Sequence, residues 1–140
     1  MLRLHSWTVD ERRRELGVLH AREEELIATG EEMARQLLRE QQAASADPAV
    51  AGFIYAAFAV GHRLRREQLG RTLAALREEI EQARDRLADA FRQLKVFEEV
   101  QKERAHQEDI DAARKEQMFF DEIAQTQFRQ KQAAKRESQT

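Results

Sequence analysis

Cysteine is absent from the 140-residue sequence, and proline, tyrosine and tryptophan each occur once. Without cysteine the chain can form no disulfide and has no thiolate for catalysis, which fits a reducing compartment. An excess of one charge is also missing, because the formal net charge is −2. Such a chain has no bulk field that would attract nucleic acid or an anionic membrane. We therefore expect no nucleic-acid partner.

Long hydrophobic runs are missing as well. The segment from Pro48 to Gly61 carries no charged residue, but its 14 residues are fewer than the ~20 that a membrane span needs. Residues 1–14 lack the apolar core of a signal peptide. We expect a cytoplasmic protein with no direct membrane span.

The patterns that support catalysis are not found either. The four histidines are never three or four residues apart, so no helix face presents a histidine pair to a metal. The five glycines are scattered and form no phosphate-binding loop. We expect no enzyme activity, no metal and no cofactor.

The single proline divides the chain. Proline disfavours helix in the residue before it and lacks the N–H that a helix interior needs, whereas it is well suited to the first helical position. Asp47 can cap the helix that follows. We therefore predict two helices, over about 3–45 and 49–131, joined at an apex over 46–58.

Both predicted helices carry an apolar stripe with three- and four-residue spacing, which is typical of a coiled-coil seam. In the first helix polar residues or glycine interrupt the stripe at Arg12, Glu23, Gly30 and Glu40. In the second helix the spacing alternates strictly between four and three. The stripe residues of the first helix are Val9, Leu16, Leu19, Leu26, Met33, Leu37 and Ala44; those of the second are Leu69, Leu73, Leu76, Ile80, Ala83, Leu87, Ala90, Leu94 and Phe97. The predicted fold is all-α, a long antiparallel two-helix coiled-coil hairpin.

The start of the first helix has two interpretations. Thr8 and Glu11 have the spacing of a capping box, which would begin the helix near Thr8. Leu2 lies seven residues before Val9 on the same stripe, which favours a start near Arg3.

The second helix is longer than the first. Folded back at Pro48, the first helix ends opposite residues 91–97, and apolar residues beyond that point have no helix of this chain to pack on. These distal residues are Ile110, Met118, Phe119, Phe120, Ile123, Ala124 and Phe128. Either a partner or a second copy of the chain covers them. Residues 132–140 are polar, and we expect them to form a flexible tail.

The apex is rich in aromatic residues. Phe53, Ile54, Tyr55, Phe58 and Val60 follow the proline closely. They form either a small cap on the first helix or a contact site, because exposed aromatic patches mark interaction surfaces. They cannot all face the seam, so some apolar area should stay exposed.

Several short segments of the sequence resemble the flagellar FliJ family of the type III export apparatus, and their order along the chain resembles that of the family. The more specific ones are Tyr55-Ala56-Ala57-Phe58 and Asp121-Glu122-Ile123-Ala124-Gln125. The others are Trp7-Thr8-Val9-Asp10-Glu11-Arg12-Arg13, Ser45-Ala46-Asp47-Pro48, and the positions Leu87, Ala90, Phe91, Leu94, Lys95 and Glu98.

The resemblance implies a non-catalytic stalk that couples the hexameric flagellar export ATPase to the cytoplasmic domain of the export-gate protein. It also implies contact with export chaperones, and peripheral association with the inner membrane at the flagellar base. The end that carries both termini would bind the ATPase ring, through Met118, Phe119, Phe120, Ile123 and Phe128. The apex would bind the gate, through Tyr55, Phe58, His62, Arg65 and Leu69. A stalk protein of the related injectisome and a homodimeric coiled-coil scaffold remain as alternatives.

Overall fold

The computed structural model describes residues 2–46 and 48–139, and the side chains of all of these except 48–51. The described residues form two helices, α1 over Leu2–Ala46 and α2 over Pro48–Ser138. The described residues contain no strand. The predicted all-α fold with a longer second helix is therefore confirmed. Pro48 is the first residue of α2, whereas the predicted cap, Asp47, lies outside the described residues.

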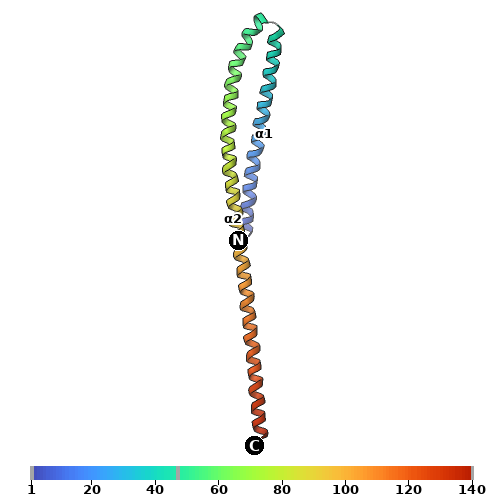
Figure 1. Cartoon of the computed structure of the whole chain (residues 1–140), viewed down its shortest axis with the longest axis vertical. Coiled ribbons are helices and arrows are strands. Elements are labelled where there is room, and N and C mark those ends of the chain that lie inside the picture. The colour runs from blue at the N-terminus through green and yellow to red at the C-terminus, as the bar shows by residue number, and fades with distance from the viewer. Residues whose placement is uncertain (1, 47, 140) are drawn as a thin grey trace. The chain divides into compact units, whose positions relative to one another are not determined.

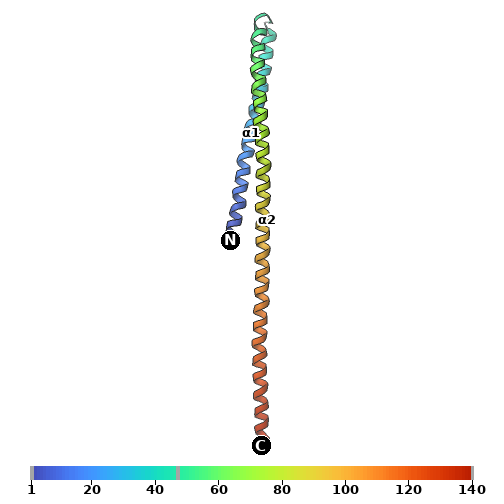
Figure 2. The ribbon, with the colours of Figure 1, turned by 90° about the vertical axis from the view of Figure 1, so that its left-hand side faces the viewer.

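The chain divides into two units, Met1–Leu94 and Lys95–Thr140. In the first unit, α1 and the beginning of α2 run side by side in opposite directions (Figures 1 and 2). Contacts across the seam define this antiparallel register. Arg77 Nε lies 3.3 Å from Glu23 Oε2, and Arg86 Nε lies 3.8 Å from Glu15 Oε2.

The core of the hairpin lies midway along the seam. Leu26, Leu76 and Ile80 form a buried cluster, and the half-buried Leu16, Leu19, Leu69 and Leu73 pack against it. Val9, Ala83 and Ala90 are also buried. Every predicted stripe residue of both helices is buried or half-buried, and so are the four interrupting positions of α1. The 3- and 4-residue spacing therefore predicted the inward faces of both helices.

The capping box predicted at Thr8 is wrong. Helix α1 begins at Leu2, so Thr8 lies inside the helix. Its Oγ1 donates a hydrogen bond to the carbonyl oxygen of Leu4, at 2.9 Å. The stripe that continues from Val9 back to Leu2 favours helix over these residues, and a mid-helix threonine satisfies its hydroxyl on the preceding turn.

The second unit consists of the remainder of α2. Only Phe97 and Ile110 are half-buried there, and every other described side chain from Lys95 onward is exposed. The helix continues to Ser138, beyond the predicted end near residue 131. Residues 132–137 are Gln, Ala, Lys, Arg and Glu, which are all good helix formers, and Lys135 and Arg136 in the last turn complement the helix dipole. That residues 132–140 are flexible stays a prediction.

No helix within the described residues is long and apolar enough to cross a membrane.

Candidate partner-binding surfaces

Clustered metal-ligating side chains are not found in the described part of the chain: no three His, Asp or Glu residues are grouped as ligands would be. The carboxylate with a clearly shifted pKa, Glu32, is an exposed surface group. Hydrogen bonds from Arg39 and Arg35 lower the pKa of Glu32, which is the usual effect of a surface ion pair. The surfaces that stand out are apolar.

The distal surface comprises the five residues predicted to bind the ATPase ring: Met118, Phe119, Phe120, Ile123 and Phe128. All five are exposed, with 60% of Phe119 and 55% of Phe120 accessible to solvent. The two phenylalanine rings meet edge to face, with centroids 6.0 Å apart. Within the second unit the structure therefore places these residues on bare helix.

The distal surface is apolar along one line and charged around it. Phe120, Ala124 and Phe128 are spaced by four residues, and Phe119 precedes Ile123 by four, so both sets follow the helix axis closely. Exposed cations precede and follow these residues in the sequence: Arg114 and Lys115 before them, and Arg129 and Lys131 after them. Such a surface can contact an apolar wall that carries acidic groups.

The five residues predicted to bind the export gate lie mostly on the inward face of α2. Tyr55 is half-buried and its Oη accepts a hydrogen bond from Gln41 Nε2, at 3.0 Å. Leu69 is half-buried and packs against the core cluster. His62 is only 6% exposed. The seam thus uses much of the surface that the sequence assigned to a partner.

Three of these residues contact one another. Phe58 is stacked on His62, with ring centroids 5.9 Å apart. The guanidinium carbon of Arg65 lies 5.7 Å from the centroid of the Phe58 ring, and Arg65 itself is exposed. The half-buried Phe58 and the Arg65 head group are the parts of this set that a partner can reach.

The outer face of α2 near the apex carries a second apolar stripe. Phe53, Val60 and Leu64 are 83%, 59% and 61% exposed, and with Ala57 they are spaced by four, three and four residues. We call Phe53, Ala57, Val60 and Leu64 the outer stripe. Sequence reasoning noted Phe53 and Val60 but not Leu64. The signal that could have found it is this repeated spacing, which runs out of phase with the seam.

The sequence model of the family described as "Flagellar FliJ protein" matches residues 1–133. The chain belongs to the FliJ family. No curated protein and no solved structure matches it. The match covers α1, α2 as far as residue 133, and the distal surface, so the resemblance drawn from short segments is confirmed.

Membership of the FliJ family supports a role in the flagellum and in protein export. The individual contacts are not given by the family match.

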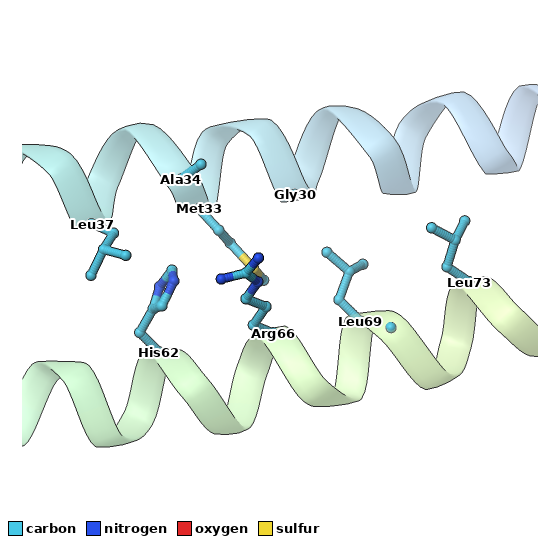
Figure 3. Close-up of a pocket in the computed structure, with 9 residues that line it drawn as sticks. Gly30, Met33, Ala34, Leu37, His62, Arg66, Leu69 and Leu73 are labelled. Carbon is cyan, nitrogen blue, oxygen red and sulfur yellow. The ribbon is translucent and has the colours of Figure 1, made fainter.

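One further feature of this FliJ-family chain was not predicted from its sequence. A cavity of about 400 Å³ lies between α1 and α2, on the apex side of the core (Figure 3). We call it the seam cavity. Its lining residues are Gly30, Met33, Ala34, Leu37, His62, Arg66, Leu69, Gly70 and Leu73. A Cβ atom at Gly30 would lie 3.2 Å from Leu69 Cδ2, so this glycine lets Leu69 approach α1. The Nδ1 atom of His62 has no hydrogen-bond partner within the described residues.

Proposed function

We propose that this protein is a non-catalytic stalk of the flagellar type III export apparatus, which links the export ATPase ring to the export gate. The observation that carries the proposal is the unpaired part of α2, with large apolar side chains that nothing in the second unit covers. The family match supports the flagellar setting. A cytoplasmic location at the flagellar base, with peripheral attachment to the inner membrane, belongs to the same proposal.

The distal surface binds the hexameric ATPase. Burying a large apolar side chain stabilises a complex by about 1.5–3 kcal/mol relative to leaving it in water. Phe119, Phe120 and Ile123 together therefore offer a substantial binding energy that the described chain does not use. The neighbouring cations suit a ring lining that is partly acidic.

The apex binds the cytoplasmic domain of the export-gate protein. Phe58 and Arg65 are the accessible members of the predicted set, and Tyr55, His62 and Leu69 hold that face of α2 against α1. An aromatic ring with a guanidinium group above it is a common anchor in protein interfaces. Export chaperones are further partners in this proposal, without assigned residues.

Deletion of all residues after Ala113 tests the ATPase contact. The truncated chain keeps the whole hairpin and loses the distal surface, so it should keep its hairpin stability but fail to copurify with the ATPase. It should also fail to promote hexamer formation or stimulate ATP hydrolysis. A truncated chain that stimulates the ATPase as well as the full chain does would place the contact elsewhere.

A homodimeric scaffold is the second candidate, because two copies could cover each other's distal surfaces. Light scattering on the full chain and on the truncated chain separates the two proposals. The stalk proposal expects monomers in both cases. A tight dimer that becomes a monomer on truncation would favour the scaffold. A chain that copurifies with an injectisome ATPase and not with the flagellar one would assign it to the injectisome.

A further inference from the structure

The seam cavity has the size and lining of a small-molecule site. At about 400 Å³ it falls in the range of about 300–1,000 Å³ that is usual for ligand pockets. Its walls are mostly apolar, with Met33 and Leu37 from α1 and Leu69 and Leu73 from α2. An occupant of this cavity must therefore have an apolar body.

The buried histidine supplies one polar group. His62 is 6% exposed, and its Nδ1 has no hydrogen-bond partner among the residues that the structure describes. In Figure 3 its ring points across the gap toward α1. Buried polar atoms in proteins are nearly always hydrogen-bonded, to protein, water or a ligand, so an atom at a cavity wall without a protein partner is a place where a ligand group can pair.

Arg66, an exposed residue one helical turn after His62, supplies the second polar group at the edge of the cavity. Its side chain extends from α2 toward Met33 (Figure 3). It makes no ion pair with any described residue, and α1 contributes no acidic side chain to the cavity lining. The cavity thus presents an unpaired guanidinium beside an unpaired imidazole, which is a combination suited to an anion.

We propose that the seam cavity binds a small amphiphilic carboxylate with an aliphatic or aromatic body. The carboxylate accepts hydrogen bonds from Arg66 and from His62 Nδ1, in the tautomer that carries its proton there. The apolar body packs against the leucines and Met33. A carboxylate is negatively charged, so its hydrogen bonds to the guanidinium and the imidazole are stronger than those of a neutral alcohol, and an amine is repelled by the guanidinium.

This site is separate from the distal surface, but it shares His62 and Leu69 with the residues predicted to bind the export gate. A ligand that fills the gap between α1 and α2 binds only the folded state. It should therefore raise the stability of the apex half of the hairpin.

Binding of defined probes to the full chain provides the test. Octanoate and 3-phenylpropionate represent the two types of body, and octanol and octylamine replace the carboxylate by a neutral and a cationic group. We expect the two carboxylates to shift the imidazole NMR signals of His62 and to bind at least about tenfold more tightly than octanol, because hydrogen bonds to charged groups are the stronger ones. A response to only one carboxylate identifies the preferred body and still supports the site. Octanol binding as tightly as octanoate, or His62 signals that do not move with either carboxylate, would overturn the proposal.

Three variants locate the site, with helicity checked by circular dichroism. Arg66→Gln removes the cation and should weaken octanoate binding about tenfold or more without affecting octanol. Leu37→Phe fills the cavity and should weaken both. Arg71→Gln is the matched control, since Arg71 is an exposed cation of the same helix that does not line the cavity, and it should leave both affinities unchanged. Octanoate binding that survives Arg66→Gln and Leu37→Phe would place the ligand elsewhere, and the Arg66→Gln result decides this alone if Leu37→Phe fails to fold.

Discussion

Two parts of α2, residues 69–94 and residues 118–128, both contain large apolar side chains but differ in how far these are exposed. From Leu69 to Leu94 the stripe residues alternate by four and three, and all of the stripe residues are buried or half-buried. From Met118 to Phe128 the apolar residues are clustered, and all of them are exposed. The presence of large apolar residues therefore does not decide whether a part of α2 is packed, because α1 covers only one face of the first part.

The first prediction uses the same substitution in both parts. Ile80 is 4% exposed and belongs to the core cluster, whereas Ile123 is 39% exposed on the distal surface. Ile80→Ala should lower the free energy of unfolding by about 2–5 kcal/mol, because it leaves a cavity in a packed seam. Ile123→Ala should change it by less than about 0.5 kcal/mol. Urea unfolding followed by circular dichroism measures both.

Equal destabilisation by the two isoleucine variants would contradict the comparison. It would mean that the distal surface of the isolated protein is packed, as it would be in a homodimer. Repeating the unfolding at several protein concentrations identifies that case, since the stability of a dimer rises with concentration.

The second prediction concerns the paired rings of the distal surface. The double variant Phe119→Ala, Phe120→Ala should weaken ATPase binding by at least about tenfold, because aromatic side chains dominate interface energies. Hairpin stability should not change, since both rings are exposed. Surface plasmon resonance gives the affinity. A double variant that binds the ATPase normally would show that this end of α2 is not the contact.

The third prediction distinguishes the two faces of α2 near the apex. Phe58→Ala removes the half-buried ring between His62 and Arg65, and it should weaken gate binding about tenfold while costing about 1 kcal/mol of stability. Phe53→Ala is the matched control, a phenylalanine of the outer stripe that is 83% exposed. It should leave gate binding and stability unchanged. If instead Phe53→Ala weakens binding and Phe58→Ala does not, the outer stripe is the gate contact.

The smallest expected effect is the pH dependence due to Glu32. Its hydrogen bonds to Arg39 and Arg35 lower its pKa from the ordinary 4.5, so the folded state binds this proton less readily than the unfolded state does. The stabilisation is therefore present above pH 4.5 and is lost as the pH falls through the lowered folded pKa. Because the group is exposed, the effect is screened by solvent and salt. The wild type and Glu32→Gln should show almost the same acid dependence of the melting temperature. A clearly weaker acid dependence in the variant would show that this surface network matters more than its exposure indicates.

Most of the fold could be predicted because it depends on local rules. One proline separates two apolar stripes, and each stripe has the period of a helix that packs along one side. The start of α1 was harder, because Thr8 suits both a capping position and a helix interior. The end of α2 was harder as well, since the residues after 131 are polar but contain no glycine or proline to stop a helix.

The candidate sites could be predicted only in part. The distal surface followed from a difference in helix lengths, which the sequence contains. The sequence did not distinguish inward-facing from outward-facing residues at the apex. Tyr55 and His62 are polar enough to suggest exposure, yet Tyr55 is half-buried and His62 is buried in the seam. The seam cavity is lined by residues of both helices, and its existence depends on the three-dimensional approach of two segments that are far apart in the sequence.

The bare helix beyond residue 110 has a consequence for the timing of any encounter. Its side chains pair locally, as Gln117 does with Asp121 at 3.2 Å, and each such pair adds only about 0.2–0.5 kcal/mol to an isolated helix. A helix of ~20 residues without tertiary support exchanges with coil in about 0.1–1 μs. Folding of this segment is therefore too fast to limit the rate at which a partner binds. In the free protein its backbone amides should exchange with solvent rapidly. They should exchange slowly while a partner is bound, so the exchange rate reports the lifetime of the complex.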